Sequence, residues 1–470
     1  MKSELRWYDY LSININWFAI TTRSQVLAPL IIPFLVAHFV GESVKGSYLG
    51  TIRLWTLMVA LLVQALSGMI SDHYASRWGK RRPFIVLGTT IEIIALGLIG
   101  ITTTMEGFSG YWVLFGLYII SMAGSNISHG ATQGFIPDLV KDENKGVASG
   151  VKASLELPIP LIFVAFVVAP MVGEHNYWNA LITLGIVLIL GTAFTMFAPE
   201  KKQEEKPSAI EWQPILRLVA MTALFTVTTL ATGWAVKQVI EFAKTSSPTT
   251  GSILVSIAGL LGMAVAIVIG VWLSVFASIG KNIKKQKSFT WWIVNRLTFL
   301  VASINLAGFL VYYLQEKFPQ YQHTETAETA SQLTMFVGIF ILFTALPGGW
   351  LTDKFGHKKI VSLAGILAGL GTFEVLISPA LSPMFIGASM IGAGVGLFYA
   401  ANWALGTVLV PQGKAGQYLG ISNLAGAGAG AVGAYIGGPI ADGYSYTLIM
   451  ALYGSMALLS LLALRGIKTE

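Results

Sequence analysis

The 470-residue chain contains no cysteine, and only 11% of its residues are charged. Without cysteine, disulfides, thiolate metal sites and thiol catalysis are all excluded. An average soluble domain carries about 25% charged residues, so this composition argues against an ordinary soluble protein. Phosphate-binding loops, serine–histidine–aspartate orders and histidine–aspartate metal spacings are also missing. We therefore expect no enzyme activity, no cofactor and no metal site.

Apolar residues dominate instead: 54% of the chain is hydrophobic, and the mean hydropathy is +0.68. Many apolar runs approach the length of about 20 residues that crosses a bilayer as a helix. The first run is too long for a signal peptide, so we expect it to remain as a span. The sequence predicts an all-α polytopic membrane protein with 14 spans, at about 12–40, 47–71, 83–104, 111–137, 146–172, 176–198, 213–241, 250–279, 289–314, 333–352, 360–379, 383–410, 415–440 and 444–465.

The lysines and arginines gather in every second connecting segment. Cytoplasmic loops carry such an excess, so the pattern predicts a plasma (inner) membrane protein with both termini in the cytoplasm. The net charge of +7 is then a property of these loops and does not indicate nucleic acid.

One loop pattern occurs twice, each time after an apolar run: Gly-x-x-x-Asp followed by a basic cluster. The first copy runs from Gly68 to Phe84 and the second from Gly349 to Lys359. The repetition predicts two six-helix bundles, at 1–198 and 280–470, with a cytoplasmic linker at 199–212 and an inserted helix pair at 213–279. Parallel repeats of six helices are typical of the major facilitator architecture. We expect a gating role for the turn residues Gly68, Asp72, Arg77, Gly79, Arg81, Arg82, Gly349, Asp353, Gly356 and Lys358.

These turns resemble the loop motif of the major facilitator superfamily, which the second copy matches without a gap. The longer first copy is similar to the loop of sucrose–proton symporters and of glycoside–pentoside–hexuronide:cation symporters. The segment from Asn126 to Leu139 resembles the sucrose transporters as well. The resemblance implies the major facilitator fold and sugar transport.

The usual coupling carboxylates of those relatives are missing. Sucrose symporters have a proton-accepting aspartate where this chain has Met122, and the second run has no acid before Asp72. The inserted pair is also foreign to both groups and is similar to that of 14-span drug:proton antiporters.

Polar residues inside the first six spans are candidate functional residues, because ionisable groups are costly there. Arg23 lies near the middle of the first run, beside Gln25. Either it has a functional role, contacting solute or pairing with a buried carboxylate, or it extends to the bilayer surface or caps a neighbouring carbonyl. Spacings of three and four residues place Asn126, His129 and Gln133 on one helical face, where they either bind solute or serve packing.

Coupling candidates follow in the fifth run. Lys152 and Glu156 lie one turn apart, just before Pro158 and Pro160. Glu156 is our first choice for a coupling carboxylate, with a structural pair to Lys152 or Arg23 as the equal alternative. His129 is a second candidate, because histidine titrates near neutral pH.

The second half offers Asn295 and Arg296 on one span and Tyr399, Asn402 and Trp403 on another. Amides and charged groups bind sugar hydroxyls, and an aromatic face binds the ring, so we expect these five residues to contact solute. For Glu92 and Glu374, in corresponding helices of the two halves, we favour a structural or conformational role.

The sequence thus predicts a monomeric secondary transporter that moves a sugar or glycoside by alternating access, coupled to a proton or sodium ion. A 14-span multidrug:proton antiporter is the main alternative, although the fifth run lacks the glycine–proline motif usual there. A membrane sensor that transports nothing is a third reading. The expected partners are the small-molecule solute and the lipid bilayer.

Overall fold

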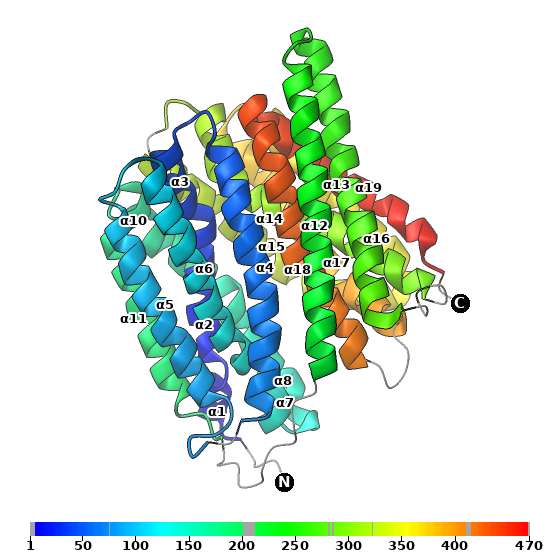
Figure 1. Cartoon of the computed structure of the whole chain (residues 1–470). Helices are drawn as coiled ribbons and strands as arrows, with labels where there is room; N and C mark the ends of the chain where they lie inside the picture. The colour runs from blue at the N-terminus through cyan, green and yellow to red at the C-terminus, as the bar shows by residue number, and fades with distance from the viewer. Residues whose placement is uncertain are drawn as a thin grey trace. The chain divides into compact units, whose positions relative to one another are not determined.

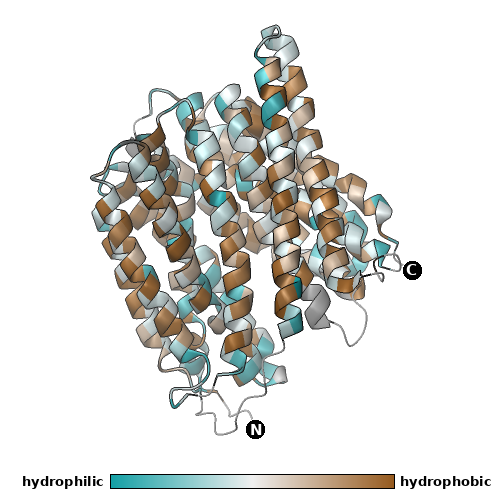
Figure 2. Cartoon of the chain, viewed as in Figure 1, coloured by the Kyte–Doolittle hydropathy of each residue, from teal (hydrophilic) through white to brown (hydrophobic). Residues whose placement is uncertain are grey.

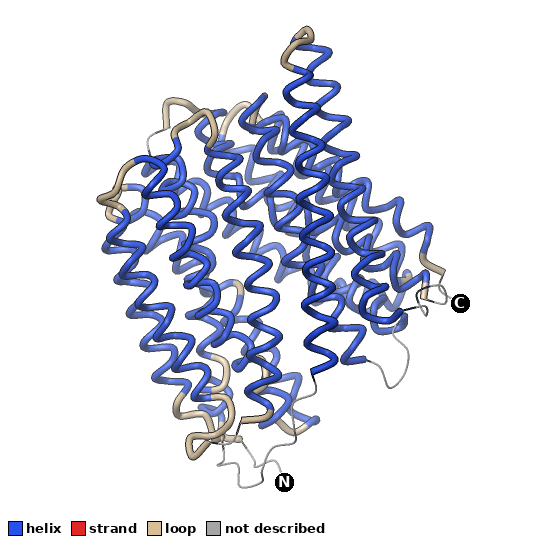
Figure 3. The backbone as a smooth tube through the Cα atoms, in the orientation of Figure 1, coloured by secondary structure: helices blue, strands red, loops and turns tan. Residues whose placement is uncertain are grey.

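The computed structural model describes residues 5–74, 76–200, 212–280, 283, 286–321, 323–409 and 415–468. Throughout these ranges the backbone forms helices and connecting loops, with no strand (Figure 3). The described residues contain 14 helices long and apolar enough to cross a membrane. Hydrophobic residues run along their lengths (Figure 2). The prediction of an all-α polytopic protein is confirmed.

Of the first six spans, the first, fourth and fifth are assembled from several shorter elements, and the other three are single helices (Figure 1). The six spans comprise α1 (Trp7–Ser12), α2 (Ile15–Val26), η1 (Leu27–Ile31) and α3 (Ile32–Val40); α4 (Lys45–Asp72); α5 (Arg82–Thr102); α6 (Gly107–Thr132) and α7 (Phe135–Leu139); η2 (Asp142–Asn144), α8 (Lys145–Glu156), α9 (Pro158–Phe163), η3 (Val164–Val168) and α10 (Ala169–Gly173); and α11 (Tyr177–Thr195).

The remaining spans are mostly single, unbroken helices. They are α12 (Trp212–Ala243), α13 (Pro248–Ile279), α14 (Lys287–Lys317), α15 (His323–Phe355), α16 (His357–Ile377), α17 (Leu381–Leu409), α18 (Ala415–Gly443) and α19 (Tyr446–Ala463), which ends in the short η5 (Leu464–Gly466).

Prolines account for the breaks in the first and fifth spans. Proline cannot donate the backbone hydrogen bond that continues an α-helix, so the ladder is interrupted near it. Pro29 lies within η1, a π-helical turn, and Pro158 begins α9 directly after the break at Leu157. The fifth span is therefore interrupted directly after Glu156.

One boundary differs from the sequence-based expectation. We predicted a span at 333–352, preceded by a polar segment at 315–332, but α15 begins ten residues earlier, at His323. Thr326, Ala327 and Ala330 are buried there, which explains why this polar stretch is helical. Composition alone did not reveal that burial.

The chain divides into two compact units. Unit 1 comprises Met1–Phe39, Val59–Ile215 and Gln322–Ser331, and unit 2 comprises Val40–Met58, Leu216–Tyr321 and Gln332–Glu470. Helix α4 is thus shared between them. The inserted helices α12 and α13 belong to unit 2, where the Phe225 ring of α12 packs over Gly270 of α13 and Gly428 of α18.

Three helices have their N-termini capped by carboxylates from elsewhere in the same unit. In unit 2, Asp442 accepts the N–H groups of Gly46 and Ser47, each at 2.7 Å, at the start of α4. Glu316 does the same for α19 through Tyr446 (2.7 Å) and Thr447 (2.9 Å). In unit 1, Glu200 caps α5. Negative charge is favourable at these positive helix ends, so the acids help to fix how the spans meet.

Candidate solute-binding and coupling site

Arg23 is buried in unit 1 and forms an ion pair with Glu92. The guanidinium of Arg23, on α2, donates through Nε to Glu92 Oε1 on α5, and the two side chains are only 2% and 1% exposed. Helix α6 completes the surroundings. Its Ser121 hydroxyl donates to Glu92 Oε1 at 2.8 Å, and the Tyr118 ring lies 5.8 Å from the guanidinium carbon.

Arg23 Nη1 donates to the sulfur of Met122 at 3.1 Å. Met122 occupies the position where the resembled sucrose symporters have an aspartate, so the expected carboxylate is missing beside this arginine. Glu92, on a different helix, supplies the negative charge. Of the roles considered for Arg23, the geometry matches pairing with a buried carboxylate.

A second polar cluster in unit 1 is built around Trp17, on α2. The His129 ring packs edge-on against the Trp17 ring, with centroids 4.9 Å apart. Lys152 Nζ lies 3.8 Å from the centre of the Trp17 ring and 3.4 Å from Glu156 Oε2. Three spans thus bring together His129, Lys152 and Glu156, which we had selected separately.

Gln133 joins this cluster, since its amide nitrogen lies 3.1 Å from Nε2 of His129. The contact joins the side chains of Gln133 and His129 one turn apart on α6 and the turn after it. Asn126 instead donates to the Met122 carbonyl of its own helix, at 2.8 Å. Gln25 is half-buried on α2. Of the three residues predicted to share one helical face, His129 and Gln133 therefore belong to the cluster, and Asn126 does not.

The five candidates of the second half meet in unit 2. Asn402 Nδ2 donates to Asn295 Oδ1 at 2.9 Å, and Arg296 Nη1 donates to Asn402 Oδ1 at 3.1 Å. Around the guanidinium carbon of Arg296 lie the rings of Trp403, at 5.3 Å, and of Tyr399 and Trp292, each at 6.0 Å.

Backbone groups hold this network in place. Asn295 Nδ2 donates to the Ser460 carbonyl at 2.9 Å, and Trp292 Nε1 donates to the Asn402 carbonyl at 2.8 Å. Asn295 and Asn402 are fully buried, whereas Tyr399 and Trp403 are each 42% exposed. The arrangement therefore has a rigid inner layer and an accessible aromatic layer, as a binding site requires.

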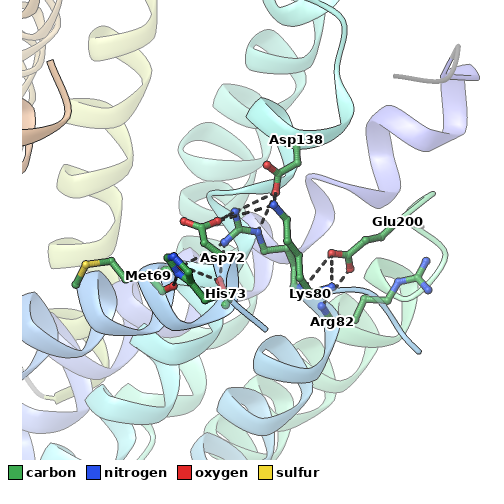
Figure 4. Close-up of polar contacts among 10 residues, drawn as sticks. Met69, Asp72, His73, Lys80, Arg82, Asp138 and Glu200 are labelled. Carbon is green, nitrogen blue, oxygen red and sulfur yellow. Dashed lines mark hydrogen bonds and ion pairs between the residues drawn. The ribbon is translucent and has the colours of Figure 1, made fainter. Parts of the chain in front are cut away.

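The first basic turn is an ion-pair network of unit 1 (Figure 4). Arg81 pairs with Asp72 and, at 2.9 Å, with Asp138. Lys80 Nζ also lies 3.0 Å from Asp138 and 3.9 Å from Asp72. Arg77 is exposed. We expected Asp72 to pair with an arginine, a lysine or a helix N-terminus across the seam between the two bundles, but its partners Lys80 and Arg81 belong to the same unit.

Glu200 closes the other side of the turn, where α5 begins. Its carboxylate accepts the backbone N–H groups of Lys80 (2.9 Å), Arg81 (2.8 Å) and Arg82 (3.3 Å). The Arg82 side chain donates to the Ala198 carbonyl. Burial raises the pKa of Glu200, while the three N–H contacts oppose that rise. Gly68 lies upstream on α4, against the Gly130 carbonyl.

The two copies of the motif share one backbone feature. Gly79 has φ +96° and Gly356 has φ +91°, values that side chains with a Cβ rarely adopt. Each glycine therefore allows the turn that leads into the next helix. In the second copy Gly349 and Asp353 end α15, Asp353 is exposed, and Lys358 donates to the Ile467 carbonyl.

Trp17, Trp292, Asp138 and Glu200 take part in these clusters but were not among our candidates. The two tryptophans look like ordinary packing residues in apolar runs. Only the spacing of four residues between Trp292 and Arg296 could have indicated a contact, the one between the Trp292 ring and the Arg296 guanidinium. Asp138 and Glu200 contact residues that lie 57 and 120 positions away in the sequence, and no local pattern reveals such contacts. Glu374 is half-buried on α16.

Unit 2 also contains a cavity of about 80 Å³ between α14, α15, α16, α17 and α19. Its lining is almost wholly apolar, including Leu306, Leu310, Val337 and Ile391. Such a lining suits hydrocarbon and not a polar solute. No group of three metal-ligating side chains occurs among the residues that the structure covers.

Known proteins match this chain at the level of fold. A transporter of the POT family, solved in complex with 5-aminolevulinic acid, superposes with a TM-score of 0.66 at 14% identity, over 96% of this chain and 94% of that one. The nucleoside transporter NupG, as a mutant, gives 0.65 at 12% identity, over 97% and 99%. These identities indicate a shared fold only.

A curated relative matches over a shorter length. A lactose permease of Lactobacillus helveticus is 27% identical over 132 residues, which cover 25% of this chain and 20% of that protein. The chain thus spans about a fifth of the length of this relative. The model of the Major Facilitator Superfamily, in contrast, matches residues 13–315 and 292–469. Because these matches cover nearly the whole chain, the protein belongs to the Major Facilitator Superfamily.

Proposed function

We propose that the protein is a secondary transporter for a sugar or glycoside, working by alternating access in the plasma membrane with both termini cytoplasmic. The observation that carries the proposal is the Arg296 cluster, in which amides, a guanidinium and accessible aromatic rings lie together within the membrane-spanning helices. Sugars are bound by this combination of groups. The lactose permease match supports the same substrate class.

The Trp17 cluster is our proposal for ion coupling. Glu156 is 41% exposed and Lys152 is 28% exposed, so their pair is open to water and to proton exchange. His129 and Gln133 lie beside it through Trp17. A carboxylate held by one lysine can release that lysine when it is protonated, which links proton binding to the local arrangement of α2, α6 and α8.

We further propose that the basic turns act as gates and that the chain works as a monomer. In the first turn Arg81 binds Asp72, at the end of α4, and Asp138, on α7, so rearranging it would free two spans from one another. The bundles 1–198 and 280–470, the linker 199–212 and the inserted pair 213–279 remain our assignment of domains. The fully described α12 and α13 are consistent with the pair.

Reconstituted vesicles test the proposal directly. Purified protein is placed in proteoliposomes, and uptake of labelled sugars and glycosides is measured with and without an imposed pH gradient. We expect uptake that an inward proton gradient accelerates, and loss of that acceleration in Glu156→Gln. Uptake that the gradient does not change, in the wild-type protein as in Glu156→Gln, would indicate uniport. Efflux of lipophilic dyes without sugar uptake would favour the multidrug:proton antiporter.

A further inference from the structure

Arg296, which is half-buried, differs from the buried Arg23 and Arg81 in having no carboxylate partner among the described residues. Among the residues described, no Asp or Glu oxygen lies within ion-pair distance of its guanidinium, although the corresponding pairs of Arg23 and Arg81 are present. Its Nε is buried and makes no hydrogen bond. A guanidinium has five N–H donors, and the Arg296 network uses one of them, on Asn402.

The surrounding helices explain why no acid reaches it. Helix α17 contains no Asp or Glu, and the acid of α14, Glu316, is twenty residues further along the helix. Glu316 is occupied by the N-terminus of α19, and Asp442 of α18 is occupied by that of α4. A cation without a counter-charge is costly within a membrane-spanning segment. The presence of Arg296 there therefore indicates a ligand that supplies the counter-charge.

We propose that Arg296 binds an anionic oxygen group of the solute, and specifically a carboxylate carried by a sugar or similarly compact ring. The inference rests on the transport function proposed above and narrows its substrate class. The planar guanidinium fork matches a carboxylate through two parallel hydrogen bonds. Asn402, itself held by Asn295, fixes one end of the guanidinium, which leaves the remaining donors in a defined direction.

The aromatic rings place the rest of the solute. Trp403 and Tyr399 follow one another at four residues on α17, and both are substantially exposed beside the cation. Cation–π contacts at 5.3 to 6.0 Å stabilise the guanidinium charge but satisfy none of its N–H donors. A ring stacked on Trp403 would bring an attached carboxylate to those donors.

A matched pair of ligands tests this inference. Methyl β-D-glucuronide and methyl β-D-glucoside share one ring and differ in a carboxylate against a hydroxymethyl group. Binding to the purified full-length protein is followed by tryptophan fluorescence, and cyclohexanecarboxylate and its amide serve as a second pair without a sugar. We expect the wild-type protein to bind the glucuronide about ten- to hundredfold more tightly than the glucoside, because the pair is charge-assisted.

The variants isolate Arg296. Arg296→Gln should lose the preference for the glucuronide, and Arg296→Lys should keep part of it, since the charge stays but the fork is lost. Arg217→Gln, which removes one positive charge from an exposed position of α12, should keep all of it. Thermal unfolding of each variant verifies that it is folded.

The outcomes separate this inference from the proposed function. A wild-type protein that binds the glucoside at least as well as the glucuronide overturns the inference and leaves sugar transport standing. Binding of cyclohexanecarboxylate but of neither glycoside supports the role of Arg296 and overturns sugar transport. Binding of no member of either pair contradicts both.

Discussion

Arg23 and Arg296 both lie within membrane-spanning helices of this protein, and their charges are compensated in different ways. In unit 1, Arg23 binds Glu92, with Ser121 and Tyr118 around the pair. In unit 2, Arg296 binds a neutral amide and three aromatic rings, with an unused Nε. A buried charge that is paired with a counter-charge of the same protein stabilises the fold, whereas a charge without a counter-charge is available to a ligand.

The largest effect on stability should follow from breaking the ion pair of Arg23 and Glu92. Arg23→Met leaves the Glu92 carboxylate buried without its cation, which typically costs about 3–5 kcal/mol. We therefore expect a strongly lowered unfolding temperature in detergent, followed by tryptophan fluorescence. The double variant Arg23→Met/Glu92→Gln, which has no charge at the site, should recover most of that loss. Equal instability of the single and double variants would show that the two residues do not stabilise one another.

A smaller effect on stability is expected from replacing Arg296. Arg296→Gln removes one hydrogen bond to Asn402, worth about 1 kcal/mol, but also removes an uncompensated charge. The free energy of unfolding should therefore change by no more than about 1 kcal/mol, in either direction. The same thermal scans measure it beside Arg23→Met. A loss as large as that of Arg23→Met would mean that Arg296 has a structural partner, which contradicts the comparison.

The sequence was sufficient for the fold and for most members of each cluster, but not for their pairing. Apolar runs and the repeated basic turn predicted the 14 spans and the superfamily, because both depend on local composition. Arg23 and Arg296 look alike in the sequence, since each is a lone cation in an apolar run. Their difference depends on Glu92, 69 residues away from Arg23, and on the lack of an acid paired with Arg296 among the described residues of unit 2.

Tertiary contacts also decided roles that spacing suggested only in part. A pair between Lys152 and Glu156 was one of the alternatives, because the two residues lie one turn apart, and this pair is present. The stacking of Lys152 and His129 on Trp17 joins spans that are separated by more than a hundred residues, so no periodicity within one helix could indicate it.

The next prediction concerns the ion pair of Asp72 and Arg81, which is accessible from outside the protein. Asp72 is 49% exposed, and Arg81 retains Asp138 and Ser71 when Asp72 is lost. Asp72→Ala should therefore cost less than about 1 kcal/mol of stability but slow transport by favouring the inward-open state. The slower transport follows from the proposed gating role, in contrast with Arg23→Met, where stability is the first loss.

The missing cysteines make that change measurable. Ser149 is exposed on α8, three residues before Lys152 and on the same face, so Ser149→Cys adds the chain's single thiol near the Trp17 cluster. Labelling by a membrane-impermeant maleimide from the cytoplasmic side should be faster with Asp72→Ala than without it. Unchanged labelling together with unchanged uptake would count against a gating role, while Asp353→Ala reports on the second copy of the turn.

The smallest effect should come from Glu200, whose carboxylate accepts three backbone N–H groups and lies near the charge of Arg82. Burial raises its pKa above the ordinary 4.5 of a glutamate, so the folded protein holds this proton to a higher pH than the unfolded chain does. Stability from this group is then present below the unfolded pKa and is lost as the pH rises through the folded pKa. Relative to Glu200→Gln, which does not titrate, the wild-type protein should lose less than about 1 kcal/mol between pH 4 and pH 7. Unfolding temperatures of both proteins across that range measure the difference. If the wild-type protein instead gains on Glu200→Gln as the pH rises, the N–H groups of Lys80, Arg81 and Arg82 outweigh burial, and a helix end compensates a carboxylate as completely as Arg23 does.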